Sequence, residues 1–376
     1  MNINKFKTEI TTFSCFIILF IPSIKYLFFS NVVNIFSVLL LIASLIFNLK
    51  KIKISKFEAI IIIIIDLFIL TQLFSGFNPD ISLDLQDILK YISLIIISTI
   101  IGLIYKFIDL KKLHIYIILW SDILIVLYLI DIISPSGAGE LSYLILSMQL
   151  GIGFCAAISL ALLNKKINFS NLFNAAVILL TISTLAGRTA IILSAIVLIF
   201  VLFLFIKSNY KSNILKVSFL VLSLSLILVI SWPIIFSDIL NEYFLYKLEK
   251  MFTSGDGRFD TYINSINIIS DNWFGIGLHQ YNTVLGFYPH NIFLESMLNA
   301  GIISGLILFL FFMIWLLLFI QNIYKYKKNN PYLISLGLLS AFLFISWNTS
   351  NNITSAYVPF SAMILSIMFN YKEKHV

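Results

Sequence analysis

Charged residues are scarce in this chain. They make up 11% of its 376 residues, whereas hydrophobic residues make up 60%. Soluble domains carry roughly 25% charged residues, so the composition excludes an ordinary soluble domain. Apolar runs long enough to cross a bilayer recur from end to end, and they are continuous rather than alternating, which favours helices over a β-barrel. The sequence therefore predicts an all-α polytopic membrane protein in which residues 1–376 form a single integral membrane domain.

Cysteine is nearly absent, and so are the common signatures of cofactor chemistry. The only two cysteines, Cys15 and Cys155, lie within apolar runs and have no metal-ligand spacing, which argues against a disulfide framework. The sequence has no Walker loop, no zinc-binding helix motif, no Gly-x-Ser-x-Gly elbow and no Asp-x-Asp pair in an exposed loop. We therefore expect no metal and no cofactor. The net charge of +7 does not indicate nucleic acid, because the distribution of the lysines explains it better.

About twelve apolar segments are candidates for transmembrane helices. We expect them at 11–29, 32–48, 58–75, 88–107, 113–133, 142–163, 169–186, 188–206, 214–236, 300–322, 332–347 and 354–370.

Lysine placement predicts how these spans are oriented. Cytoplasmic loops carry an excess of Lys and Arg. With the N-terminus inside, 19 of the 23 lysines fall on the cytoplasmic side. This alternation supports twelve spans with both termini in the cytoplasm. It also places residues 237–290 in one long outer loop, in which we expect an amphipathic helix at 238–252, a short helix at 259–269 and a turn at 272–277.

Arginine is almost missing, since Arg188 and Arg258 are the only two in the chain. Both fall on the outer side, against the charge bias, so they do not serve to set topology. A guanidinium presents a planar fork that matches phosphate oxygens, which makes both residues candidates for binding a phosphate group. The alternatives at Arg188 are a snorkelling interfacial side chain and a structural ion pair. Those at Arg258 are a solvated surface arginine and a salt bridge to Asp256 or Asp260.

His290 is the main candidate for acid–base chemistry. It follows Pro289, where we expect a helix to begin and to continue as the tenth span. The N-terminus of a helix offers free backbone N–H groups to an anion, and a histidine can act as a general base near neutral pH. The alternative is a capping or polar interface residue. His279 is a second candidate in the same loop.

Four further residues stand out inside the apolar segments. Asp66 and Asp122 lie well within spans, where acids are costly and often functional; the alternative is hydrogen bonding between helices. Gly301 and Gly305 have the spacing that allows close helix packing, and we expect a structural role for them.

Three blocks in this order carry a family resemblance. The first is Arg-Thr-Ala at 188–190. The second is Gly257-Arg258, followed by Phe274-Gly-Ile-Gly277. The third is His290-Asn291-x-x-Leu294-Glu295, followed by Gly301. Together with the twelve spans and the long outer loop, these blocks resemble the O-antigen ligase and O-antigen polymerase superfamily of bacterial polysaccharide assembly. The chain departs from the usual family pattern at Gly187, Tyr262 and Asn299.

The resemblance implies a metal-independent glycosyltransferase at the outer leaflet of the bacterial inner membrane. The implied donor is a glycan on undecaprenyl pyrophosphate, and the implied acceptor is a lipid-linked repeat unit or lipid A-core. Family roles make Arg188 and Arg258 binders of the pyrophosphate, and make His290 the general base or a leaving-group contact. The implied supporting residues are Asn291, Glu295, Gly275, Gly277 and Tyr262. Membrane lipids and a chain-length regulator protein are the other expected partners.

Three functions remain open on the sequence alone. The first is a polymerase that joins repeat units of O-antigen or capsular polysaccharide. The second is a ligase that transfers the finished glycan to lipid A-core. The third, from a different class, is a flippase or transporter, for which Asp66 and Asp122 would be the polar residues near the midplane.

Overall fold

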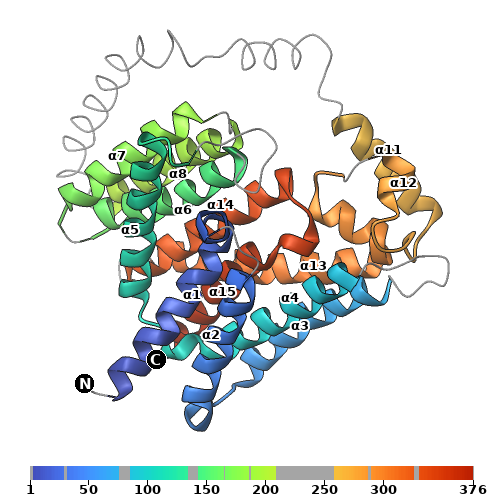
Figure 1. Cartoon of the computed structure of the whole chain (residues 1–376), viewed down its shortest axis with the longest axis horizontal. Helices are drawn as coiled ribbons and strands as arrows, with labels where there is room; N and C mark the ends of the chain where they lie inside the picture. Colours follow the sequence, from blue (N-terminus) through green and yellow to red (C-terminus); the bar gives the residue numbers. More distant parts are fainter. Residues whose placement is uncertain are drawn as a thin grey trace. The chain divides into compact units, whose positions relative to one another are not determined.

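The computed structural model describes residues 3–28, 32–75, 85–133, 143–164, 166–185, 188–208, 258–286, 289–325 and 330–375. Throughout these residues the regular structure is helical, without strands (Figure 1). The predicted all-α membrane fold is therefore confirmed. The predicted span at 214–236 and the predicted helix at 238–252 lie outside the described residues.

The helices group into two compact units. The first unit joins residues 1–116 to residues 258–376, and the second comprises residues 117–257. The first unit holds α1 (Ile3–Phe28), α2 (Val32–Asn48), η1 (Leu49–Lys51), α3 (Lys56–Phe74), α4 (Leu85–Ile104), η2 (Tyr105–Phe107), α11 (Arg258–Asp271), α12 (Tyr281–Leu285), α13 (Ile292–Tyr324), α14 (Pro331–Ser350), η4 (Ile353–Ser355) and α15 (Tyr357–His375). Helix α5 (Leu110–Leu129) runs from the first unit into the second, and α6 (Tyr143–Leu162), α7 (Phe169–Thr184) and α8 (Arg188–Ser208) complete the second.

Nine helices within the described ranges are long and apolar enough to cross a membrane, namely α1 to α6, α8, α13 and α14. Helix α7 is apolar but shorter, with 16 residues. The observed bounds of most helices lie close to the predicted ones. The total of twelve spans stays a prediction, because part of the chain lies outside the described residues.

The core of the first unit lies where α3, α13 and α15 meet. Phe360 on α15 packs edge-on against Phe68 of α3 and Phe311 of α13, with ring centroids 5.8 and 6.1 Å apart. All three rings are buried. Aromatic pairs at such distances and angles add to the free energy gained from burial alone. Helix α13 is thus fixed at its centre, and its N-terminal end carries the candidate site.

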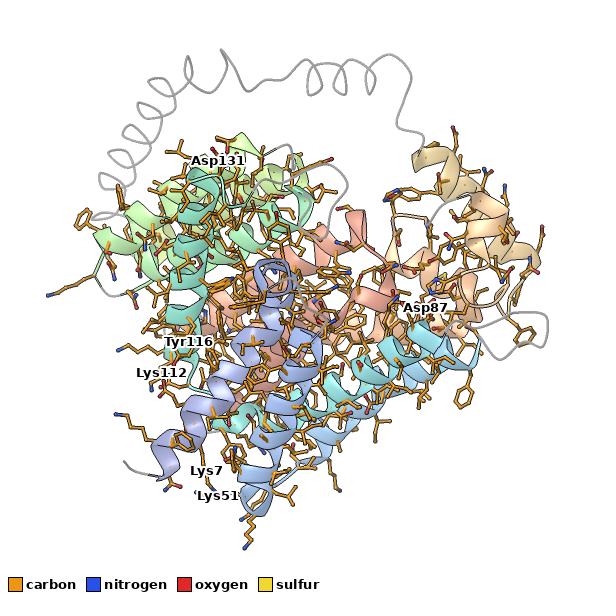
Figure 2. The ribbon with its side chains drawn as sticks, viewed as in Figure 1. Lys7, Lys51, Asp87, Lys112, Tyr116 and Asp131 are labelled. Carbon is orange, nitrogen blue, oxygen red and sulfur yellow. The ribbon has the colours of Figure 1, made fainter. Side chains whose placement is uncertain are left out.

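Lysines gather at one end of the first unit. Figure 2 labels Lys7, Lys51 and Lys112 at that end, and Asp87 at the opposite end of the unit. Lys7 donates to the carbonyl oxygen of Phe47 (2.7 Å), and Lys51 donates to the Asn4 side chain (2.9 Å). This separation agrees with the lysine alternation in the sequence. The assignment of the lysine-rich end to the cytoplasm stays a prediction.

The two intramembrane acids make hydrogen bonds between helices. Thr99 of α4 donates to Asp66 of α3 at 2.8 Å, and Asn174 of α7 donates to Asp122 of α5 at 3.2 Å. These contacts favour the structural alternative for both residues, because each carboxylate accepts from the neighbouring helix.

Candidate active site

Helix α13 is broken near its beginning, at Gly301. This residue has φ 83° and ψ 177°, which no helix accommodates, although helical structure continues on both sides. The break leaves two backbone carbonyls, of Leu298 and Asn299, without their usual partners one turn ahead. The nine residues before Gly301 therefore form a separate short helix in front of the span.

The turn after α11 satisfies the backbone groups that the break exposes. Ile276 N–H donates to Leu298 O at 2.7 Å, and Gly277 N–H donates to Asn299 O at 3.1 Å. In return, Ile302 N–H donates to Trp273 O at 3.0 Å. Buried backbone groups left unpaired are costly, so these three hydrogen bonds hold the turn 272–277 against the break. We refer to this arrangement as the clasp.

The clasp requires glycine on both sides. A Cβ on Gly275 would lie 2.6 Å from Asn299 O, and a Cβ on Gly301 would lie 2.4 Å from Trp273 O. Both residues, and Gly277, also have positive φ, which glycine adopts at little cost. Gly301 thus has the structural role that we expected, but the residue is needed for a backbone break rather than for close packing of two helices. Gly305 faces the Met297 side chain instead.

The start of α13 differs from the prediction. The helix begins at Ile292, and Asn291 is its N-cap, so Pro289 and His290 lie before the helix rather than in its first turn. Asn291 accepts from the backbone N–H groups of Phe293 (3.0 Å) and Leu294 (3.1 Å), and Asn348 accepts from Ile292 N–H (2.8 Å). The expectation that these N–H groups are free to bind an anion is therefore wrong, since protein oxygens already occupy them.

His290 is held in a left-handed backbone conformation, with φ 50°. Its side chain is half-buried. The hydroxyl of Tyr262 on α11 donates to the His290 carbonyl oxygen at 3.4 Å. Arg258 is the first residue of α11, one turn before Tyr262. The structure thus brings together the start of α11, Tyr262 and His290, three of the elements that the sequence singled out.

Glu295 is buried at the centre of a polar chain. It is 1% exposed, and its two oxygens accept from the Tyr281 hydroxyl (2.9 Å) and from Ile353 N–H (2.9 Å). His279 Nδ1 lies 3.0 Å from the same Tyr281 hydroxyl, and its Nε2 lies 3.5 Å from Asp87 Oδ2. This chain of contacts joins the segment before α12, α12 itself, α13, η4 and the first turn of α4. The role of Glu295 as a supporting residue of the active site stays a prediction.

Burial shifts the pKa values of two members of this chain, His279 and Tyr281. Desolvation lowers the pKa of His279; the nearby Asp87 carboxylate opposes the change, and Lys90 adds to it. Burial, followed by the negative charge of Glu295, raises the pKa of Tyr281. The phenol therefore stays protonated near neutral pH and remains a hydrogen-bond donor to Glu295.

A second polar seam joins α13 to α3. Asn299 accepts from His279 N–H (3.0 Å) and donates to Gln72 (3.0 Å), and Gln72 donates in turn to the buried Ser304 (2.6 Å). Such hydrogen bonds fix the facing of helices inside a membrane. The amides of Gln72 and Asn299, each within an apolar run, were the signal in the sequence that could have indicated this seam.

Arg188 belongs to the second unit. It is the first residue of α8, and α7 ends at Thr184, so only three residues separate the two helices. This close spacing agrees with the prediction. Since Arg188 lies in one unit and Arg258 and His290 in the other, the common pyrophosphate site of these three residues stays a prediction. In the described ranges, no group of three or more His, Cys, Asp or Glu side chains is arranged to hold a metal ion.

A comparison with protein families gives a match to part of the chain. Residues 169–310 match the family model described as O-antigen ligase. The matched segment contains Arg188, Arg258 and His290, together with the clasp. Comparisons with curated proteins and with solved structures gave no match. Over residues 169–310, the family match confirms that this chain resembles the O-antigen ligase and O-antigen polymerase superfamily.

Proposed function

We propose that the protein is a polymerase that joins undecaprenyl-pyrophosphate-linked repeat units of O-antigen or capsular polysaccharide at the outer leaflet of the bacterial inner membrane. The observation that carries the proposal is the family match, because the three candidate residues Arg188, Arg258 and His290 all fall inside it. The match indicates a ligase- or polymerase-type function and a membrane glycosyltransferase-like enzyme. It gives no indication of a flippase.

In the proposed reaction, a hydroxyl of the acceptor sugar attacks the anomeric carbon of the donor glycan. A new glycosidic bond forms, the bond from that carbon to the pyrophosphate oxygen breaks, and the lipid pyrophosphate leaves. His290 accepts the proton of the attacking hydroxyl. Arg188 and Arg258 bind the pyrophosphate and stabilise the charge that grows on it as it leaves, an electrostatic effect that is often the largest in such sites.

The capping of α13 supports arginines as the anion-binding groups. The first N–H groups of α13 already donate to Asn291 and Asn348. A pyrophosphate beside His290 would therefore find its hydrogen-bond donors on side chains rather than on the helix terminus. The link from Tyr262 to the His290 backbone puts the first turn of α11, where Arg258 lies, close to this position.

The orientation of the protein is part of the proposal. We infer that both termini are cytoplasmic and that residues 237–290 face the periplasm. A cysteine at position 256 (Asp256→Cys) should react with a membrane-impermeant maleimide in intact cells, whereas Lys327→Cys should react only after the membrane is opened. Labelling in the reverse order would overturn the orientation.

Reconstitution separates the polymerase from the ligase. The purified protein in liposomes, given only lipid-linked repeat units, should form chains of more than one repeat and release undecaprenyl pyrophosphate. A ligase would leave these units unjoined and would transfer glycan only when lipid A-core is added. Activity that persists in EDTA would support metal independence, and loss of activity restored by a divalent cation would contradict it.

A further inference from the structure

Helix α11 presents three different faces. Thr261, Ser265 and Ile269 lie on the face that packs against the rest of the first unit, and each is at most 7% exposed. A second face is polar and exposed, with Asn264 and Asn267 among its residues. A helix that belonged only to a solvated loop would need just these two faces.

The third face is apolar and exposed. Phe259, Ile263 and Ile266 recur at helical spacing and are 69%, 43% and 57% exposed. The strip continues beyond the helix with Trp273 (68%) and Phe274 (88%). Trp273 Nε1–H donates to Ser270 O at 2.8 Å, which fixes the indole at the C-terminal end of the strip. We call these five residues the α11 strip; contiguous exposed apolar surface of this kind marks an interaction site.

The strip is continuous with the surface that α13 presents to lipid. The clasp fastens Trp273 O to Ile302 N–H at 3.0 Å. The next residue, Ile303, is 63% exposed, and Leu306 one turn on is 56% exposed. Both lie in α13, one of the helices that are long and apolar enough to cross a membrane. Trp273 and Phe274 therefore lie at the level where the lipid-facing surface of this span begins.

We propose that the α11 strip inserts into the lipid–water interface of the leaflet that faces the candidate site, and that its partner is the phospholipid bilayer itself. Tryptophan is enriched at this depth because its ring is apolar while its N–H is polar. Amphipathic helices lie in the interface with their apolar face buried roughly 5–10 Å. Because α11 contacts His290 through Tyr262, this insertion holds the candidate site at the depth of the lipid headgroups.

The exposed polar face of α11 also indicates how the strip binds. Asp260 and Asp271 lie on it, beside the two asparagines, and the described part of the helix after Arg258 has no basic residue. Attraction to anionic lipid therefore does not drive the insertion. Burial of the apolar side chains and the attachment to α13 do so instead.

Spin labels on single cysteines test the proposal in liposomes of phosphatidylethanolamine and phosphatidylglycerol. Labels at Phe259→Cys, Ile263→Cys and Ile266→Cys should collide several-fold more with oxygen, relative to a water-soluble nickel chelate, than labels at Asn264→Cys and Asn267→Cys. The native Cys15 and Cys155 are buried. Labelling of the unsubstituted protein gives the background signal from these two cysteines. Replacing phosphatidylglycerol with phosphatidylcholine should leave the ratios unchanged.

Three outcomes would contradict the proposal. Equal ratios on both faces would mean that the strip lies in water. Protection of the apolar positions from both reagents would mean that protein covers them, either residues 209–257 of this chain or a second copy. Loss of insertion without phosphatidylglycerol would contradict the apolar mechanism. The measurement reads no transferase activity, so its result is independent of the proposed function.

Discussion

Gly275 and Gly301 lie back to back, so close that a Cβ on Gly275 would come within 2.6 Å of Gly301 N. The two residues are 26 positions apart in the sequence. Each has a positive φ, and each approaches the backbone of the segment that contains the other. Their contact fixes the turn 272–277 to the start of the tenth predicted span.

Alanine at Gly275 or Gly301 should destabilise the protein strongly. Left-handed strain alone costs about 1–3 kcal/mol per residue, and the backbone contacts at 2.4–2.6 Å add a steric clash that no side-chain movement relieves. Gly286→Ala is the matched control: it has φ 79° but no atom within 4 Å of a built Cβ. Thermal unfolding in detergent should show a larger loss at Gly275 and Gly301 than at Gly286. Equal losses at all three would mean that the close contact contributes nothing.

Glu295→Gln should destabilise the first unit, because both of its oxygens accept hydrogen bonds and an amide nitrogen would face a donor. The expected loss is about 1–3 kcal/mol in the free energy of unfolding. Tyr281→Phe removes one of these donors, so the two changes together should cost less than their sum. Additive losses in thermal unfolding would contradict the shared hydrogen bond.

Stability should depend on pH through His279. The pKa of His279 in the folded protein lies below its ordinary value of about 6.5. The unfolded chain therefore takes up a proton first as the pH falls, and the stability that the neutral imidazole provides is present above about pH 6.5 and decreases below it. His279→Gln should lose less stability than the wild type between neutral and mildly acidic pH. Parallel melting curves across this range would show that His279 does not contribute.

Lysine should not replace either arginine. Arg188→Lys and Arg258→Lys keep the positive charge but lose the planar fork that binds phosphate oxygens. Loss of one such donor typically costs about 10²–10³-fold in rate, so chain formation from lipid-linked repeat units should fall by that order. Lys325→Arg, at the C-terminus of α13, is the control and should be fully active. Normal activity of a lysine variant at normal protein level would return that arginine to a structural role.

His290→Ala should bind the lipid-linked donor but transfer it about 10²–10⁴-fold more slowly, the usual contribution of a general base. His290→Gln can donate a hydrogen bond without accepting a proton near neutral pH. An inactive glutamine variant that still binds donor supports the general base, whereas an active one limits His290 to contact with the leaving group. Wild-type activity of the alanine variant would remove His290 from the mechanism.

The helices and the candidate residues were predictable from local patterns, and the contacts that join them were not. Long runs of Ile, Leu and Phe predict spans because apolar side chains and internally paired backbone are what lipid requires. The two apolar runs at 169–186 and 188–206 nearly adjoin, and this spacing likewise predicts the tight connection between α7 and α8. Residue type and spacing are sufficient for both.

Contacts between residues far apart in the sequence determine the features that local patterns did not predict. Gly301 and Gly305 have helix-packing spacing, yet the backbone of Trp273 and Phe274 makes the first of them a break. Pro289 suggests a helix start, but Asn348, 56 residues after Ile292, supplies the acceptor that lets the helix begin at Ile292. The buried Glu295 carboxylate likewise accepts a hydrogen bond from a distant group, Ile353 N–H, which its local sequence does not indicate.

The clasp also sets an order of assembly. Its three hydrogen bonds connect residues 273–277 with residues 298–302, so they form only when both segments are on the same side of the membrane. Helix α13 can insert as a span before that moment, but its first nine residues cannot take their final direction. In the orientation proposed above, the neighbourhood of His290 is therefore completed late, only after residues 237–290 have crossed the bilayer. A chain stalled at that stage would be inserted and yet inactive.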